Sequence, residues 1–141
     1  MHIDGKCHCG NIRLQLDWPG EASSIALRAC GCDFCQKHGA SWISHRAAEL
    51  AVTIADRSLL SPYRFGTATA EFYVCARCGA VPVAVSTIDG HAYAVVNANT
   101  LEGIERNALA RAATDFDGEA TGERLERRKR SWIPAVRIAF G

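Results

Sequence analysis

Two short cysteine motifs, Lys6-Cys7-His8-Cys9-Gly10 and Cys75-Ala76-Arg77-Cys78-Gly79, decide how this chain of 141 residues folds. Each motif places two thiols in one tight turn, and a glycine after the second thiol relieves crowding. A closed structural zinc site needs four ligands, which the two pairs supply together. Because the pairs lie far apart in the sequence, a shared ion would staple the beginning of the chain to its middle.

The other three cysteines, Cys30, Cys32 and Cys35, form a C-x-C-x-x-C motif, and no cysteine lies outside these three groups. Three protein ligands leave a fourth coordination position for water or substrate, which is typical of a catalytic zinc. The spacing therefore predicts two zinc ions, one held by four cysteines and one by three.

Three other interpretations of the cysteines stay open. His38 or His8 could complete the triplet and make it a second closed structural site. A C-x-x-C pair can also be a redox centre, although the βαβ context expected around a thioredoxin-like motif is missing. Finally, the cysteines could be buried and chemically inert.

The number of cysteines and the start of the chain bear on the oxidation state of the thiols. Seven cysteines cannot pair completely as disulfides. Met1 is followed by His2, Ile3 and Asp4, without the basic start and apolar run of a secretory signal. No stretch approaches the roughly 18 apolar residues of a membrane span. We therefore expect a cytoplasmic protein with reduced thiols.

Composition indicates one globular domain without an obligatory polyanionic partner. The length suits a single domain over residues 1–141, with a core at about 3–118 and a C-terminal extension at 119–141. Sixteen lysines and arginines face fifteen acidic residues, for a formal net charge of +1. This balance favours neither nucleic acid nor a membrane surface as a partner.

Short strand patterns dominate the first two thirds of the chain. Apolar residues alternate with polar ones from Ile12 to Trp18, the period of a strand with one buried face. Asp89-Gly90 lies between two apolar runs and predicts a hairpin turn. Weaker strand candidates are residues 25–28, 41–44, 50–54, 71–74 and 81–87.

The last third predicts helix or extended chain. Residues 101–113 have the spacing of a short helix, with Leu101, Ile104, Ala108 and Leu109 on one side. Residues 121–132 predict a solvated helix or an extended tail. Five basic residues between Arg124 and Arg130 could attract phosphate or an acidic ligand, but a solvent-exposed charged face is the favoured interpretation.

The cysteine motifs, taken with Asn11-Ile12 after the first and Tyr63-Arg64-Phe65 before the last, resemble the glutathione-dependent formaldehyde-activating enzyme family. This family shares its domain with centromere protein V. The resemblance runs from about Cys7 to Asn99, and residues 115–118 are also similar. The ordered set of cysteines is far more specific for the domain than for the reaction.

The resemblance implies a mainly β fold, the β-tent, built of short antiparallel sheets. It implies a structural zinc on Cys7, Cys9, Cys75 and Cys78 and a second, labile zinc with a catalytic role on Cys30, Cys32 and Cys35. The family's activity joins the thiol glutathione to the aldehyde formaldehyde, and in reverse it is a carbon–sulfur lyase. A zinc-stabilised binding module without catalysis is the rival hypothesis. A methionine sulfoxide reductase would need a further reactive cysteine, which is absent after Cys78.

Substrate contacts are harder to predict. No conventional acid/base pair stands out, and for Trp42 a role in the core is favoured over a role in the cleft. The other side chains that could line a cleft beside the triplet are Lys37, His38, Arg46, Asn97 and Asn99.

Overall fold

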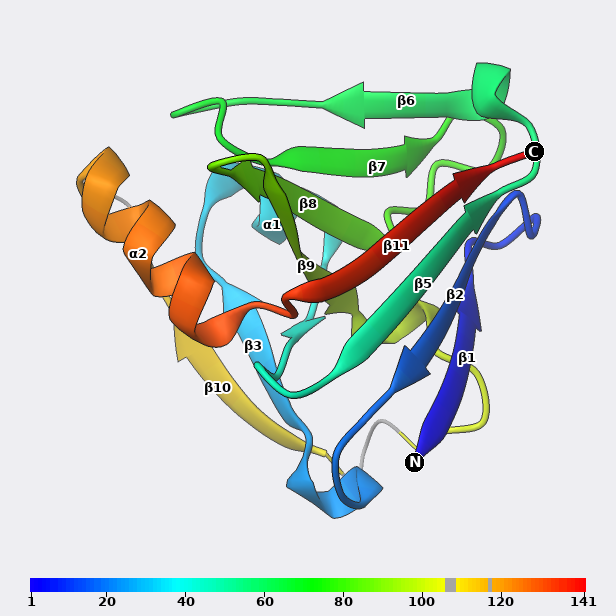
Figure 1. Ribbon diagram of the computed structural model, residues 1–141, viewed down its shortest axis with the longest axis horizontal. Helices are drawn as coiled ribbons and strands as arrows, with labels where there is room; N and C mark the ends of the chain where they lie inside the picture. Colours follow the sequence, from blue (N-terminus) through cyan, green and yellow to red (C-terminus); the bar gives the residue numbers. More distant parts are fainter. Residues whose placement is uncertain (106–108, 117) are drawn as a thin grey trace.

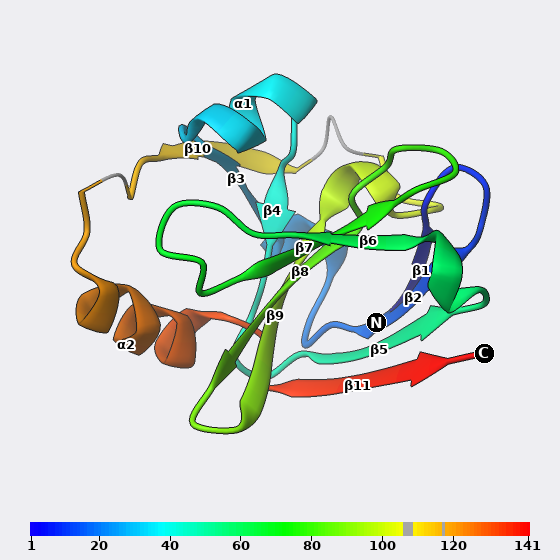
Figure 2. The same ribbon diagram turned by 90° about the horizontal axis from the view of Figure 1, so that it is seen from above.

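The computed structural model describes residues 1–105, 109–116 and 118–141 (Figure 1). Two β-sheets form the body of the molecule; α2 lies at the end away from β1 and the C-terminus, and α1 lies beside β3 and β10 (Figure 2). The prediction of a mainly β protein is confirmed, and of the two forms expected for residues 121–132, a helix or an extended tail, the helix is present. No helix in the described part of the chain has the length and apolar character to cross a membrane.

The first sheet has four strands in the order β1-β2-β5-β11. Along β2 buried and exposed residues alternate, so Ile12, Leu14 and Leu16 face the core as predicted. β11 pairs with β5 in parallel over six residues, which places the end of the chain within this sheet. The strands are β1 (His2–Lys6), β2 (Ile12–Asp17), β5 (Glu49–Ile54) and β11 (Ala135–Phe140).

The second sheet has seven strands in the order β10-β3-β4-β9-β8-β7-β6. All of its pairings are antiparallel except that of β3 with β10. The strands are β3 (Ala26–Cys30), β4 (Trp42–Ile43), β6 (Leu60–Tyr63), β7 (Glu71–Cys75), β8 (Val83–Ile88), β9 (His91–Asn97) and β10 (Ala110–Thr114).

The predicted hairpin turn is present between β8 and β9. Asp89 and Gly90 have φ of 53° and 79°. A two-residue turn with positive φ at both positions matches the twist of the flanking strands, which explains the Asp-Gly pair. The hairpin forms the centre of the second sheet.

Helices are few and short. α1 (Asp33–His38) begins after Cys32 and ends at Gly39, which is left-handed with φ of 72°. α2 (Thr121–Ser131) follows β10 and precedes β11. Three 3₁₀ turns complete the described elements: η1 (Ala22–Ser24), η2 (Arg57–Leu59) and η3 (Ala98–Thr100).

Two apolar clusters stabilise this arrangement. The larger one joins the sheets and contains Leu14, Leu50 and Val96 together with Cys7 and Cys75. The smaller one gathers α1, β4 and the end of α2, with Cys35, Trp42 and Trp132 among its members. The cysteine groups are thus embedded in the packing of the sheets.

The predicted helix over residues 101–113 is wrong. Leu101 forms an isolated bridge with Gly5, Gly103 has φ of 73°, and residues 110–114 form β10. The alanines and arginine of β10 favour a helix in isolation, but pairing with the free edge of β3 overrides that weak preference. Ala108, on the predicted helical face, lies outside the described residues.

Candidate functional site

Four cysteines meet where the start of the chain approaches the end of β7. Cys7 directly follows β1, and Cys75 is the last residue of β7. The ligand atoms of Cys7, Cys9, Cys75 and Cys78 all lie within 4.8 Å of one another. The two motifs predicted to share an ion are therefore brought together.

The two turns are built alike. The Gly10 amide donates to the Cys7 carbonyl at 3.1 Å, and the Gly79 amide donates to the Cys75 carbonyl at 2.8 Å. Both glycines are left-handed, with φ of 85° and 79°. Glycine adopts this conformation without the clash that a Cβ would introduce, which explains its place after each pair.

The sulfur positions fit a tetrahedral ion. The Sγ atoms of Cys7 and Cys9 are 3.7 Å apart, and those of Cys9 and Cys75 are 3.5 Å apart. A disulfide would need about 2.05 Å. Tetrahedral zinc with Zn–S bonds of about 2.3 Å places its sulfurs roughly 3.8 Å apart. The four thiols are free and have a donor set compatible with zinc.

Proton affinity differs within this group. Burial raises the pKa of Cys7 to about 11. Burial alone would also raise the pKa of Cys78, but the backbone amides of Ala80 and Cys9 hydrogen-bond its sulfur and lower the pKa to about 6. A bound cation favours the thiolate form of its ligands, so metal binding at Cys7 would release a proton.

The second group lies at the junction of β3 and α1. Cys30 ends β3, Cys32 caps α1, and Cys35 lies in the first turns of that helix. Their ligand atoms are also mutually within 4.8 Å. The Gly31 amide donates to the Thr114 carbonyl at 2.7 Å, which ties the loop between Cys30 and Cys32 to β10.

Hydrogen bonds to sulfur position the triplet. The Cys35 amide donates to Cys32 Sγ at 3.4 Å, and the indole Nε1–H of Trp42 donates to Cys35 Sγ at 3.3 Å. The hydrogen bond with Cys30, followed by burial, raises the pKa of Cys35, whereas the Trp42 hydrogen bond opposes this. Burial is the main cause that raises the pKa of Cys32.

The two groups differ in access. The triplet opens into a cavity of about 430 Å³, a size typical of small-molecule sites. None of the four cysteines of the first group lines this cavity. Among the described residues, no histidine joins either group, so neither His8 nor His38 completes the triplet.

Aromatic side chains and arginines form the rest of the cavity wall. The aromatic residues are Trp42, Phe65, Phe72, Phe116 and Trp132, and the arginines are Arg28, Arg124, Arg127 and Arg128. α2 supplies three of the four arginines. The cavity wall therefore combines thiols, aromatic rings and a strongly basic set of arginines.

The interpretation of the basic run as a solvated face is wrong for three of its members. Arg124, Arg127 and Arg128 line the cavity, and Arg128 is only 6% exposed. Their spacing of i, i+3 and i+4 puts them on one face of a helix. This spacing was the sequence signal, whereas the position of the face relative to the triplet depends on the packing of α2.

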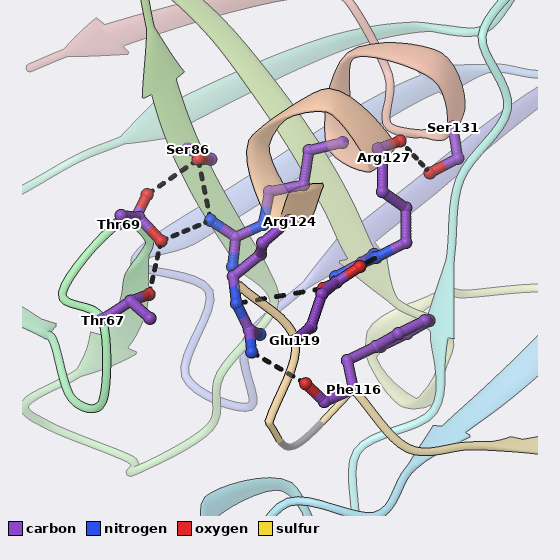
Figure 3. A network of polar contacts seen from close by, with 9 residues as sticks. Thr67, Thr69, Ser86, Phe116, Glu119, Arg124, Arg127 and Ser131 are labelled. Carbon is purple, nitrogen blue, oxygen red and sulfur yellow. Dashed lines mark hydrogen bonds and ion pairs between the residues drawn. The ribbon is translucent and has the colours of Figure 1, made fainter. Parts of the chain in front are cut away.

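Glu119 is the acidic partner on this wall. Figure 3 shows its carboxylate beside the side chains of Arg124 and Arg127. Arg127 Nη2 lies 3.1 Å from the carboxylate, and the Arg127 guanidinium stacks 3.6 Å above the Phe116 ring. The Arg127 hydrogen bond lowers the pKa of Glu119, which favours its charged form.

The other predicted contacts do not line the cavity, with Trp42 as the exception. The His38 ring packs against Phe34 at 4.4 Å, and burial lowers its pKa. The Asn97 side chain accepts from the Ser41 amide and donates to the Val81 carbonyl, a structural role. Lys37, Arg46 and Asn99 are likewise absent from the wall.

Comparison with known proteins identifies the class. The model of the glutathione-dependent formaldehyde-activating enzyme family matches residues 2–117. The chain belongs to this family, which confirms the resemblance. The family is associated with enzymatic activity on formaldehyde at the level of its description.

One solved structure supports the fold. It is the crystal structure of a Rhodobacter sphaeroides protein from a structural genomics programme, with 28% sequence identity and a TM-score of 0.59. The alignment covers 77% of this chain and 99% of that one. No curated protein matches the chain. Both Glu119 and the arginines of α2 lie beyond the residues that the family model matches.

Proposed function

We propose that this protein is a zinc-dependent carbon–sulfur lyase of the glutathione-dependent formaldehyde-activating type. It would join a small thiol such as glutathione to a small aldehyde, and it would also catalyse the reverse. The observation that carries this proposal is the contrast in access: three cysteines face a cavity of about 430 Å³, and the other four do not.

The residues present fit two zinc ions. Cys7, Cys9, Cys75 and Cys78 would hold a structural ion, and Cys30, Cys32 and Cys35 would hold a second one. The second zinc would supply a positive charge that favours the deprotonated form of a substrate thiol. The indole N–H of Trp42 would hold the Cys35 sulfur in place for this task.

The cavity would contribute by positioning. The stacked rings of Phe65 and Phe72 line it, and Trp132 packs the end of α2 against the second sheet. Two small reactants held side by side react faster because their encounter no longer costs translational freedom. A C–S bond forms as the thiol adds to the carbonyl carbon, and the thiol proton ends on the new hydroxyl oxygen.

We favour this reaction over the rival hypothesis of a binding module, whose best support was the basic run, read as an outer surface. Arg124, Arg127 and Arg128 line the cavity, and Lys129 pairs with Asp89 at 3.1 Å. A long nucleic acid needs an exposed basic stripe, so the arrangement favours a small molecule.

Exchange spectroscopy tests the proposal directly. Zinc-loaded protein is added to ¹³C-formaldehyde and glutathione, and the rate of exchange between free formaldehyde and the S-hydroxymethyl adduct is measured by NMR. We expect acceleration that depends on protein concentration and is lost in Cys32→Ser. His8→Ala, an exposed change beside the first group, is the matched control and should retain the rate. Equal rates with and without folded, zinc-loaded protein would refute the proposal.

A further inference from the structure

Arg128 is a buried, fixed cation on the cavity wall. It is 6% exposed, and its Nη1 donates to Thr69 Oγ1 at 2.8 Å and to Ser86 Oγ at 3.1 Å. The Ser86 hydroxyl in turn donates to the Thr69 carbonyl at 2.7 Å (Figure 3). The Thr69 and Ser86 hydroxyls thus hold the guanidinium in one place without neutralising it.

Within the described residues, the Arg128 guanidinium lies 4.8 Å from the centre of the Trp132 ring but has no ion-pair partner. No carboxylate there lies within 4.0 Å of Arg128, and its buried Nε has no hydrogen-bond partner. Burying a charge without a partner is costly, because water no longer solvates it. A wall built around such a cation is typical of a site that receives its counter-charge from a ligand.

The Glu119 carboxylate is hydrogen-bonded to Arg127 rather than to Arg128. Both of its oxygens accept from Arg127, at 3.1 and 3.2 Å from Arg127 Nε. Arg124 lies farther away, at 3.9 Å from the carboxylate, and its buried Nε has no hydrogen-bond partner. Within the described residues, Arg124 Nη2 donates to the Phe116 carbonyl at 2.8 Å. The Nε atoms of Arg124 and Arg128 therefore both lack a hydrogen-bond acceptor within the described residues.

The charge balance points the same way. The described residues of the cavity wall include four arginines and one glutamate, a formal surplus of three positive charges. Three thiolates and a divalent ion at the triplet would add minus three and plus two, so a surplus of two would remain. Counted over the described residues, a neutral substrate would leave this surplus without a counter-charge.

Repulsion among the arginines is consistent with this balance. Burial, together with the charges of Arg124 and Arg127, lowers the pKa of Arg128 to about 10. Burial, and then the charge of Arg127, also lowers the pKa of Arg28. Arg128 remains charged at neutral pH, because a pKa of about 10 lies well above it.

We propose that Arg124 and Arg128 form an oxyanion subsite that holds the carboxylate or phosphate end of the substrate while its other end reaches the cysteine triplet. The inference deepens the proposed function, on which it rests for the reacting end. The substrate class is then a short molecule with an oxyanion head, an apolar middle against Phe72 and Trp132, and a thiol or thiol adduct. Because α2 lies outside residues 2–117, this specificity belongs to the chain's own C-terminal segment.

Direct binding of thiol-free probes tests the subsite. Calorimetric titration of the zinc-loaded protein uses glutarate as the carboxylate, methyl phosphate as the phosphate and glutaramide as the neutral analogue. We expect at least one anion to bind, with glutaramide at least tenfold weaker. Binding of glutarate alone identifies a carboxylate head, and binding of methyl phosphate alone identifies a phosphate head. Equal affinity for glutaramide, or no binding of either anion, would overturn the proposal.

Matched variants distinguish anion binding at the subsite from non-specific attraction to positive charge. Arg124→Gln and Arg128→Gln should each weaken anion binding at least tenfold, whereas Arg130→Gln removes the same charge from an exposed position of α2 and should change it less than twofold. An equal loss in all three would mean non-specific attraction and would refute the subsite. Should Arg128→Gln fail to fold, Arg124→Gln decides alone, since this side chain is partly exposed.

The probes need neither a thiol nor turnover. Anion binding that depends on Arg124, found together with an unaccelerated formaldehyde exchange, would support the subsite and refute the proposed reaction. Accelerated exchange with no anion binding would do the opposite. The two proposals can therefore fail separately.

Discussion

The two cysteine groups offer the same ligand atom, a thiol sulfur, but differ in their position in the fold and in their access to the cavity. The group of four ties β1 to β7, includes two fully buried thiols and lies away from the cavity. The group of three lies at the start of a six-residue helix and forms part of the cavity wall. Both groups offer the same type of ligand, so access to the cavity is what distinguishes the proposed catalytic group from the proposed structural one.

The largest expected difference between the two cysteine groups is their effect on folding. Cys75 is 0% exposed within the larger apolar cluster and belongs to the group of four. Structural zinc contributes about 10–16 kcal/mol of apparent binding free energy in small zinc domains. We expect Cys75→Ser to lose its cooperative thermal transition in circular dichroism, and Cys32→Ser to keep it. Equal melting curves for the two variants would contradict the division.

The second largest expected effect is on the zinc affinity of the triplet. Trp42→Phe keeps an aromatic ring in the smaller apolar cluster but removes the N–H that donates to Cys35 Sγ. Loss of a hydrogen bond to a ligand typically costs about 10- to 100-fold in metal affinity. Competition with a chromophoric chelator should show this loss for one zinc ion while the other is unaffected. Unchanged affinity for both ions would exclude a positioning role for Trp42.

Backbone strain at Gly79, beside the group of four cysteines, should have a smaller effect on the free energy of unfolding. Gly79 has φ of 79°, and no atom lies within 4 Å of a Cβ placed there, so strain alone opposes a side chain. Gly79→Ala should lower the free energy of unfolding by about 1–2 kcal/mol. Gly122→Ala, in α2 with equally open space and no positive φ, is the control and should leave stability unchanged or raise it. Urea denaturation measures both.

The smallest expected effect is the loss of Glu119's contribution to stability at low pH. Because the pKa of Glu119 is lowered in the folded protein, its contribution to stability is present above its ordinary pKa of about 4.5 and is lost as the pH falls through the folded value. Glu119→Gln should therefore melt at a lower temperature than wild type at pH 7. The difference should vanish in strong acid. Glu126→Gln changes an exposed residue of α2 and should show little difference at either pH.

Local patterns predicted the parts of the fold that depend on local physics. The alternation along β2 and the Asp89-Gly90 turn needed only the period of a strand and the φ of a hairpin. β10 escaped prediction because an edge of β3, distant in sequence, turns a helix-prone segment into a strand. The arginine face of α2 was visible as a spacing, but its burial depends on how α2 packs beside β8.

The cysteine groups were predictable for a similar reason. Short spacings bring two or three thiols together whatever the rest of the chain does, and seven cysteines divide into four and three. The pairing of Cys7 and Cys9 with Cys75 and Cys78 followed from the four ligands of a closed site. The open cavity beside the triplet needed the structure, because its walls come from β3, β7, β8 and α2.

Metal counting tests the division of the cysteines most directly. The number of zinc ions per chain is measured by elemental mass spectrometry. The samples are folded wild type and folded Cys32→Ser, both purified with zinc present. The account predicts two zinc ions in wild type and one in the variant, with the fold intact. One zinc ion in both proteins would contradict it.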